Sequence, residues 1–165
     1  MISRRGVFAG IAFVSLAAVA AALTLQYRFG MQPCPWCILQ RVIFIAVAAA
    51  ALIGSLWRSR PGVVLSSVML AILAGCGVAA ALWQHFVAAS SASCDLTLAE
   101  RIVSALSLDE RWPEVFTAYA SCRDAAVNLL GVPFELWSGA LFALVLVTAL
   151  LLLRGAAARP RRRYR

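Results

Sequence analysis

The sequence predicts an all-α membrane protein, a four-transmembrane-helix bundle in which one long loop carries a short amphipathic helix. Three observations predict this fold. Hydrophobic residues make up 63% of the chain and charged residues only 13%, against about 25% charged residues in soluble domains. Four apolar stretches approach the ~20 residues that a spanning helix needs. The arginines gather on one side of these stretches, a bias typical of the loops of membrane proteins.

The four predicted spans cover about residues 7–25, 38–57, 63–87 and 134–153 of the chain, whose 165 residues form a single domain by length. They leave a short loop at about 26–36 and a long loop at about 88–133 on one face of the membrane. The opposite face receives the N-terminus, the turn between the second and third spans, and a tail at 154–165.

Arginine indicates which face is cytoplasmic. Ten of the fifteen arginines lie on the face that holds both termini, whereas all seven acidic residues lie toward the other face, the last being Glu135. By the positive-inside rule both termini are therefore cytoplasmic. The net charge of +8 is thus an orientation signal, and because the chain has no Lys and no basic groove we expect no nucleic-acid partner. The ten arginines are Arg4, Arg5, Arg58, Arg60, Arg154, Arg159, Arg161, Arg162, Arg163 and Arg165.

The first apolar stretch has a rival interpretation as a cleavable signal peptide. Ser3, Arg4 and Arg5 precede it, and Ala18-Val19-Ala20 is similar to a cleavage site. The stretch is longer than the roughly 7 to 15 apolar residues of a signal peptide. Its removal would also leave three spans. We therefore expect it to remain as the first span, which N-terminal sequencing of the purified protein would test.

The long loop contains a helical repeat of apolar residues. They lie opposite a polar set, so a short amphipathic helix is expected there. The aromatic residues that follow allow two interpretations: they lie along the lipid headgroup layer, or they belong to a small helix that packs on its own loop. The apolar set is Leu98, Ile102, Ala105 and Leu106, the polar set is Glu100, Arg101 and Ser104, and the aromatic set is Trp112, Phe116 and Tyr119.

Four of the five cysteines fall in the two loops that we place outside the cytoplasm, where disulfides persist. They are Cys34, Cys37, Cys94 and Cys122. The fifth, Cys76, lies inside the third span between two glycines, and we interpret it as a small packing residue at a helix contact.

Cys34 and Cys37 form a Cys-Pro-Trp-Cys motif at the start of the second span. Pro35 suits the first turn of a helix. The amides and the dipole at a helix N-terminus stabilise a thiolate, which is the species that attacks disulfides and donates electrons. We therefore expect one of the two cysteines to be unusually acidic.

Arg41 lies four residues after Cys37, on the same helical face and one turn deeper. A cation here opposes the positive end of the helix dipole and lies on the side of the membrane that the other arginines avoid. It is either an anion clamp for a thiolate or for something bound beside it, or an interfacial side chain that snorkels to the headgroups. As a clamp it is expected to contribute little to the fold.

Cys94 and Cys122 lie far apart in the same long loop. They are either a static staple worth roughly 2 to 4 kcal/mol, or part of a relay in which two disulfides on one side of the membrane exchange by thiolate attack. The nearby Cys-x-x-Cys motif favours the relay. A zinc site built from all four loop cysteines is disfavoured, because the second pair lacks a short spacing and no loop His completes it.

The four spans, the Cys-x-x-Cys at the start of the second, the Arg four residues later and the second cysteine pair in a long loop together resemble the DsbB family of disulfide bond formation proteins. The resemblance covers nearly the whole chain. It is carried by the stretches PCPWCILQR, SCDLTLAERIVSALSLDERWPEVF and SCRDAAVNLLGVPFELWS. It implies a protein-disulfide:quinone oxidoreductase in the bacterial inner membrane, whose long loop is periplasmic.

That resemblance also implies roles for the cysteines. Cys34 and Cys37 are the pair that faces a quinone of the ubiquinone or menaquinone type, with Cys37 engaging the quinone and Arg41 as its electrostatic partner. Cys94 and Cys122 face a DsbA-like periplasmic thiol oxidase. The mixed disulfide with that oxidase falls on Cys94, and Cys122 exchanges with Cys34.

Gln84 and His85, the only histidine, lie near the outer end of the third span, where members of the family offer polar side chains to the quinone site. Neither aligns with a particular family position. His85 is either part of the site or an interfacial residue that binds headgroups.

Two other functions compete with this one. An oxidoreductase of the vitamin K epoxide reductase type performs similar relay chemistry, but that family carries its active pair near a later span. A membrane scaffold or transporter subunit would use the loop cysteines only as staples. It would leave Arg41 and the Cys-x-x-Cys motif without a role, and the ionisable residues of a transport path are missing from the spans.

Overall fold

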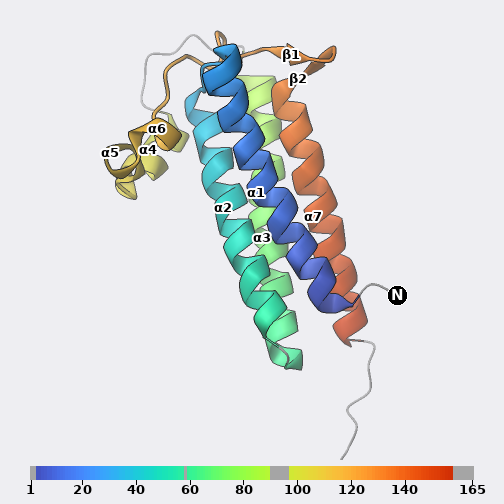
Figure 1. The fold of residues 1–165 in the computed structure, drawn as a ribbon. Coiled ribbons are helices and arrows are strands. Elements are labelled where there is room, and N and C mark those ends of the chain that lie inside the picture. Colours follow the sequence, from blue (N-terminus) through green and yellow to red (C-terminus); the bar gives the residue numbers. More distant parts are fainter. Residues whose placement is uncertain (1–2, 58, 90–96, 158–165) are drawn as a thin grey trace, which may run out of the picture.

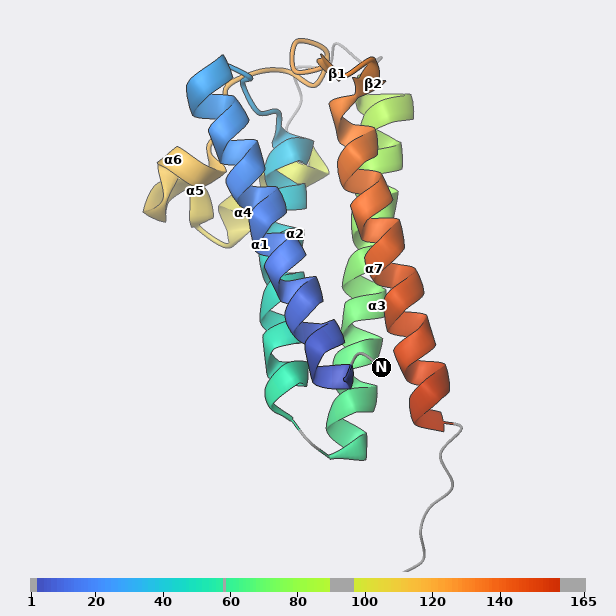
Figure 2. The same cartoon turned by 45° about the vertical axis from the view of Figure 1, so that its right-hand side comes forward.

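The structure is a computed structural model that describes residues 3–57, 59–89 and 97–157. Four long helices lie side by side along its length (Figures 1 and 2). Each is long and apolar enough to cross a membrane, which confirms the predicted four-helix bundle. They are α1 (Arg4–Phe29), α2 (Pro35–Leu56), α3 (Arg60–Trp83) and α7 (Phe134–Ala157), and a π-helical turn, η1 (Gln84–Ala88), continues α3.

Serine caps explain why α1 and α3 begin earlier than the apolar stretches do. The Ser3 hydroxyl accepts a hydrogen bond from the Gly6 amide at 3.1 Å, and the Ser59 hydroxyl accepts one from the Gly62 amide at 3.3 Å. A capping side chain satisfies an amide that has no partner within the helix, so the helix can start among polar residues. Each helix therefore reaches past its apolar run into the headgroup region.

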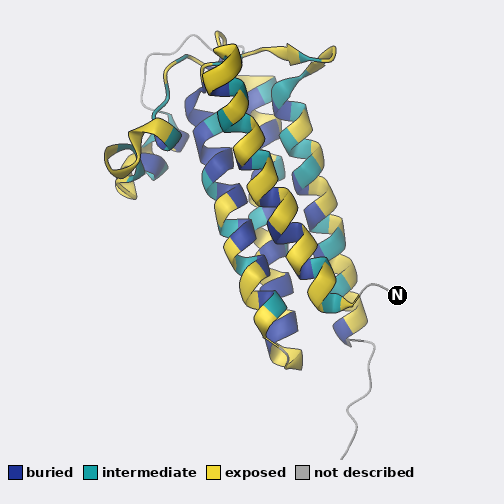
Figure 3. Ribbon diagram, in the orientation of Figure 1, coloured by how far each residue is buried: buried dark blue, intermediate teal, exposed yellow. Residues whose placement is uncertain are grey.

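The burial pattern of the bundle fits a lipid environment. Exposed residues run along the outer faces of the long helices (Figure 3). They include large apolar residues such as Phe13, Leu52 and Leu151. The interior holds the rings of Phe44 and Phe142, which stack with centroids 3.9 Å apart. Lipid-facing residues are as apolar as those inside, because the bilayer core offers them no water.

The expectation for Cys76 was wrong. Its side chain is exposed on the outer surface of α3 and does not lie at a helix contact. The contact is made by its neighbour Gly77, where an added Cβ would come within 2.5 Å of the Phe142 ring. Small residues at such positions let two helices approach closely. The small residues of this stretch do mark a helix contact, but the residue at the contact is Gly77 and not Cys76.

The expected amphipathic helix in the long loop is present as α4 (Leu98–Ala105). A capping box starts it: the Thr97 hydroxyl accepts from the Glu100 amide, and the Glu100 carboxylate accepts from the Thr97 amide. Of the apolar set, Ile102 is partly buried against the core whereas Leu98 is exposed, and the buried residues of the helix are Ala99 and Val103. Leu106, at the end of the helix, is also exposed.

Two short helices, α5 (Leu108–Arg111) and α6 (Pro113–Phe116), follow α4. The ring of Phe116 is buried against Ile38 of α2 and Val103, whereas Trp112 and Tyr119 are about half exposed. Each interpretation therefore holds for part of the aromatic set. Phe116 packs on the protein, and Trp112 and Tyr119 are exposed and available to a headgroup layer.

A small hairpin before α7 was not expected from the sequence. Strand β1 (Asn128–Leu129) pairs antiparallel with β2 (Val132–Pro133), with Leu129 opposite Val132. Leu130 and Gly131 between them both have positive φ angles, of 55° and 81°, as a type I′ turn requires.

Three hydrogen bonds attach the long loop to the first loop and to α1. The amides of Tyr119 and Ala120 donate to the Pro33 carbonyl at 3.0 and 3.3 Å. The Tyr27 hydroxyl, near the end of α1, donates to the Glu114 carbonyl at 2.6 Å. These bonds hold the segment that contains Cys122 against the start of α2, where the Cys-x-x-Cys motif lies.

Candidate active site

The Cys-x-x-Cys motif lies at the N-terminus of α2, as predicted. Cys34 is the N-cap residue, and its sulfur accepts a hydrogen bond from the Cys37 amide at 3.3 Å, with Pro35 in the first turn. The two sulfurs are 2.9 Å apart, so closing a disulfide requires little movement. Cys34 is fully buried, and Cys37 is partly exposed.

Cys122 joins this pair from the long loop. Its sulfur interacts with the Cys34 side chain and accepts a hydrogen bond from the Trp36 amide. The hydrogen bond with Cys34 lowers the pKa of Cys122, whereas hydrogen bonds with Cys122 and then with Cys37, together with burial, raise the pKa of Cys34. The proton therefore stays on Cys34, and Cys122 is the thiolate of this couple.

The other loop cysteine, Cys94, lies outside the described residues, and its predicted pairing with Cys122 stays a prediction. The structure brings together three of the four predicted catalytic cysteines, in the order Cys122, Cys34, Cys37. That order is the one expected if Cys122 exchanges with Cys34.

Trp36, between the two cysteines of the motif, packs against a second tryptophan. Its ring is 8% exposed, and its centroid lies 6.2 Å from that of Trp83, at the end of α3. The bulky pair closes one side of the cysteine motif. Burial of this kind keeps water away from the sulfur atoms and strengthens the electrostatic interactions around them.

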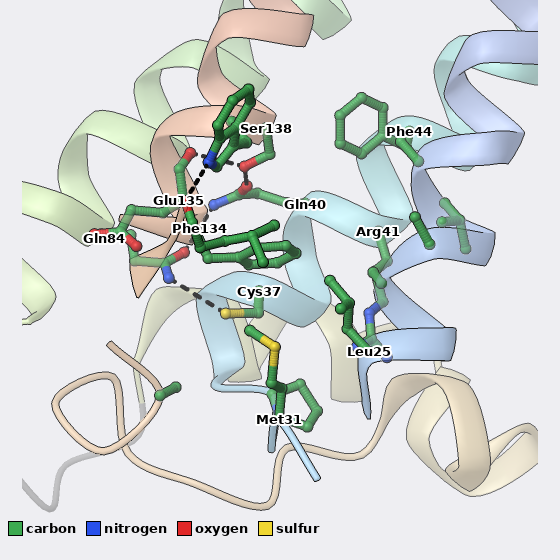
Figure 4. A pocket seen from close by; sticks show the side chains of 18 of the residues that line it. Leu25, Met31, Cys37, Gln40, Arg41, Phe44, Gln84, Phe134, Glu135 and Ser138 are labelled. Carbon is green, nitrogen blue, oxygen red and sulfur yellow. Dashed lines mark hydrogen bonds between the residues drawn. The ribbon is translucent and has the colours of Figure 1, made fainter. Parts of the chain in front are cut away.

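A cavity of 240 Å³ opens beside Cys37 between α1, α2 and α7 (Figure 4). Its wall is mainly apolar, with side chains such as Leu25, Phe44 and Phe134. A few polar side chains interrupt this wall, an arrangement typical of small-molecule sites. They include Cys37, Gln40, Arg41, Gln84, Glu135 and Ser138.

A chain of hydrogen bonds ends on the Cys37 sulfur. The Gln84 amide nitrogen donates to Cys37 Sγ at 3.2 Å, and the Gln40 amide nitrogen donates to the Gln84 oxygen at 2.8 Å. Ser138 of α7 in turn donates to the Gln40 oxygen. Every donor points toward the sulfur, so this series of hydrogen bonds favours negative charge on Cys37. Gln84 and Cys37 come from different helices, and their meeting was not predictable from spacing.

The π-helical turn aims two consecutive residues into the bundle. Gln84 is buried and faces Cys37, and the next residue, His85, places Nδ1 2.8 Å from a carboxylate oxygen of Glu135 on α7. Glu135 is 5% exposed and lines the cavity, whereas the His85 side chain is 30% exposed. Single π-helical turns often mark functional sites because they rotate side chains out of the regular helical order.

Arg41 is buried, with only 5% exposure, which contradicts the snorkelling interpretation. One guanidinium nitrogen donates to the Gln26 side-chain oxygen of α1 at 2.8 Å and to the Val115 carbonyl of α6 at 2.9 Å. Neither partner is charged, so these bonds leave the positive charge available to an anion in the cavity that Arg41 lines. The expectation that Arg41 contributes little to the fold was wrong, because it links α1, α2 and the long loop.

Sequence reasoning missed four polar residues of this site: Gln26, Gln40, Glu135 and Ser138. One signal was available, because polar and ionisable side chains within spans face the bundle interior or a cavity. Gln26, Gln40 and Gln84 each lie near the Cys37 end of one of the first three helices. All three are buried, as this signal would have predicted.

A dithiol at a helix N-terminus, a third cysteine in contact with it and a cavity between membrane-spanning helices define a multi-pass membrane oxidoreductase that acts in disulfide formation. The family model of disulfide bond formation protein DsbB matches residues 4–152. The chain therefore belongs to the DsbB family. Because the match begins at residue 4, the first helix is part of the family domain.

Curated relatives agree with this assignment. The chain is 31% identical to disulfide bond formation protein B of Pseudomonas syringae pathovar tomato, over 83% of this chain and 82% of that protein. It is 34% identical to the protein of the same name from Cupriavidus necator, over 91% of this chain and 93% of that protein. It is 33% identical to the protein of that name from Burkholderia pseudomallei, over 83% of this chain and 82% of that protein.

Proposed function

We propose that the chain re-oxidises a DsbA-like periplasmic dithiol oxidase and passes the two electrons to membrane quinone. It is then a protein-disulfide:quinone oxidoreductase. The observation that carries the proposal is the contact sequence from Cys122 through Cys34 to Cys37, which ends at a cavity in the membrane region. Such a sequence moves a disulfide from the loop to the cavity by successive exchange reactions.

The exchange begins when a thiolate of the reduced oxidase attacks Cys94 of a Cys94–Cys122 disulfide and releases the Cys122 thiolate. The Trp36 amide, which donates a hydrogen bond to the Cys122 sulfur, stabilises this thiolate while Cys34 is still in its disulfide. Cys122 then attacks Cys34 of the Cys34–Cys37 disulfide, and the Cys37 thiolate leaves. The role of Cys94 rests on the family resemblance, whereas the contact between Cys122 and Cys34 supports the second step.

The oxidase then completes its own disulfide. Its second thiol resolves the mixed disulfide and frees Cys94, which attacks Cys122 and frees Cys34. The loop disulfide is restored, and Cys34 and Cys37 hold both electrons. The electrons leave as the Cys34–Cys37 disulfide closes again, and the net reaction converts dithiol and quinone into disulfide and hydroquinone.

The cavity fits a quinone headgroup. Its apolar walls suit a flat ring, and its volume of 240 Å³ is close to the lower end of the roughly 300–1,000 Å³ of ligand pockets. When bound, a quinone supplies the two-electron acceptor. Gln84 holds negative charge on Cys37, and the Arg41 guanidinium attracts the negative charge that reduction of the ring creates.

Reduction of a quinone to a hydroquinone also takes up two protons. Glu135 on the cavity wall, hydrogen-bonded to the partly exposed His85, is placed to hold a proton at its carboxylate and to regain it from the imidazole. An imidazole can accept a proton at one ring nitrogen and donate one from the other, which suits it to this exchange. This pair supports a proton route between the cavity and the outside of the bundle.

Quinone reduction by the purified full-length protein tests the proposal. Supplied with a reduced DsbA-like oxidase and a short-chain ubiquinone, the protein should reduce one quinone for each oxidase disulfide formed. Absorbance of the quinone and thiol titration of the oxidase measure the two products. Oxidase disulfide formation without quinone loss would contradict the electron path.

The order of the loop pair is tested by trapping. Cys122→Ser leaves Cys94 without its partner, so the mixed disulfide with the oxidase should accumulate and appear as a covalent adduct on non-reducing electrophoresis. Cys94→Ser should give no adduct. An adduct with Cys94→Ser instead would reverse the order of the two loop cysteines.

The orientation in a bacterial inner membrane, with both termini cytoplasmic, is part of the same proposal. Alkaline phosphatase is active only outside the cytoplasm, so a fusion near Ser107 should be active. A fusion after Arg165 should be inactive. The reverse result would place the cysteine loops on the reducing side and remove the basis for stable disulfides.

A further inference from the structure

A second cavity lies at the end of the bundle opposite Cys37, where α1 and α3 begin and α2 and α7 end (Figure 1). Its volume is 550 Å³, and all four long helices contribute to its wall. Three arginines line it: Arg4 and Arg5 in the first turn of α1, and Arg60 in the first turn of α3. Nothing in the redox chemistry proposed above uses this site.

Positive charge gathers at this cavity. Helices α1, α2 and α3 contain no Asp or Glu, and the first acidic residue of the chain is Asp95. The helix dipoles largely offset one another here, because α1 and α3 begin at this end and α2 and α7 end at it. The three guanidinium groups repel one another, and a bound anion relieves that repulsion.

Arg4 is partly fixed in place. A guanidinium nitrogen of Arg4 donates to the Gly155 carbonyl near the end of α7 at 2.8 Å. This bond holds the side chain across the gap between two helices, and guanidinium groups have further donors that can bind phosphate oxygens in pairs. An ordered guanidinium loses less conformational entropy on binding than a free one.

The rest of the wall is suited to a lipid. Trp57 ends α2, is about half exposed, and packs on Gly62, where an added Cβ would lie 2.4 Å from the indole ring. Tryptophan prefers the membrane–water interface. Buried Phe8 and Val63 form an apolar floor beneath the arginines. A free phosphate ion gains nothing from such a floor, whereas the glycerol and upper acyl chain of a phospholipid do.

We propose that this cavity binds the phosphodiester headgroup of an anionic glycerophospholipid, of the phosphatidylglycerol type. Arg4, Arg5 and Arg60 bind the phosphate oxygens, and Trp57 lies beside the glycerol. The lipid then bridges the ends of α1 and α3, beside the bond that Arg4 makes to Gly155 of α7. Basic pockets between membrane helices commonly hold anionic headgroups in this way.

Native mass spectrometry of the full-length protein in a neutral detergent tests the proposal. The probes are phosphatidylglycerol and phosphatidylcholine with identical acyl chains, added at equal concentration. The variants are Arg4→Gln and Arg60→Gln, and the matched control is Arg154→Gln, which removes the same charge from the same end of the bundle but does not line the cavity. Inorganic phosphate serves as the competitor.

We expect the wild-type protein to retain one phosphatidylglycerol and little phosphatidylcholine. Arg4→Gln and Arg60→Gln should each weaken retention on the order of tenfold, the effect of losing one charge-assisted hydrogen bond, and Arg154→Gln should not.

Equal losses in all three variants would show a diffuse charge effect and overturn the site. No loss in either cavity variant, or equal retention of both lipids, would also overturn it. Displacement of the lipid by millimolar phosphate would assign the cavity to the free ion. Arg4→Gln also removes the bond to Gly155 and could impair folding. In that case Arg60→Gln, which leaves this bond intact, supplies the test.

Discussion

The two ends of the helix bundle treat charge in opposite ways. At the Cys37 end, Gln40, Gln84 and Ser138 are joined by hydrogen bonds that lead to the sulfur. Among the described residues of this cavity wall, Arg41 is the one cation, and it is buried and held by neutral partners. At the other end, three arginines surround a cavity with no acidic residue in the adjoining helices α1, α2 and α3.

The two ends thus show two ways in which a protein can stabilise a negative charge. Fixed neutral dipoles aimed at one atom stabilise charge that appears only during a reaction, because nothing must move when it forms. A group of like charges instead favours an anion that is bound permanently. If the Cys37 end has the first property, loss of its thiols should have the largest effect, followed by loss of the Arg41 charge and then of the Gln84 dipole.

Loss of either thiol at the Cys37 end should abolish turnover. Cys34→Ser and Cys37→Ser each remove a sulfur for which the site has no substitute, and quinone reduction should fall to background while the protein remains inserted. The matched control is Cys76→Ala, whose side chain is exposed on α3 far from the motif in sequence, and it should stay near wild-type activity. Quinone reduction near wild-type rates in either serine variant would end the relay proposal.

Arg41→Met should weaken apparent quinone affinity or turnover by roughly tenfold to hundredfold, from the loss of about 1.4 to 3 kcal/mol of charge-assisted interaction. Arg41→Lys keeps the charge but loses the planar fork, so it should lose less. Titration of quinone at saturating reduced oxidase measures both.

A second variant separates the electrostatic role of Arg41 from its structural one. Gln26→Leu removes the acceptor of its 2.8 Å hydrogen bond but keeps the charge. It should lower thermal stability, by about 1 to 3 kcal/mol for an unsatisfied buried donor, and should affect quinone affinity less than Arg41→Met does. If Gln26→Leu reproduced the full kinetic loss, Arg41 would act as a positioning residue only.

Gln84→Leu should slow quinone reduction roughly three- to tenfold, the value of one neutral hydrogen bond. The substitution keeps the shape of the side chain and removes the donor to Cys37 Sγ. Ser138→Ala, two bonds further along the chain, should have a smaller effect. A single-turnover measurement with the pre-reduced protein isolates this step, and an unchanged rate in Gln84→Leu would show that the sulfur does not need the amide.

The smallest effect concerns the pH dependence of Cys122. Its pKa is lowered by the hydrogen bond with Cys34, so its thiolate and its alkylation rate should persist at pH values below the ordinary range of a thiol and fall as the pH drops through the lowered pKa. Cys34→Ala removes that hydrogen bond and should shift the alkylation profile of Cys122 to higher pH. Mass spectrometry after timed alkylation of reduced protein measures the profile, and identical profiles in both proteins would contradict the contact.

Much of the fold was predictable because its signals are local. The length of an apolar run predicts a span, and a proline after a cysteine predicts the start of a helix. The capping box of Thr97 and Glu100 that starts α4 is also a local signal, although no prediction was drawn from it. Each of these inferences needs only residues within a few turns of one another.

The cavity was not predictable because its contacts join distant segments. Gln40 and Gln84 are 44 positions apart, and Ser138 lies 98 positions after Gln40. Spacing shows which residues share a helix face but does not show which faces meet. The same limit explains why periodicity identified the apolar set of α4 but not its buried residues, Ala99 and Val103.

The hairpin before α7 was missed for a different reason. Its strands have two residues each, too few for an alternating pattern, and its turn carries Leu130 where Asn or Asp is usual. A leucine with a positive φ angle is uncommon, so no local rule favours the turn.

The two tryptophans beside the motif provide an intrinsic spectroscopic probe of the site. Trp36 is covalently placed between Cys34 and Cys37, and its ring lies 6.2 Å from that of Trp83. Two indoles at this separation couple their electronic transitions, so any rotation of Trp36 as the sulfurs bond or separate changes near-ultraviolet circular dichroism. The redox state of the motif can therefore be followed without a dye, in real time and in the presence of lipid, with Trp83→Phe as the protein in which the coupled signal should disappear.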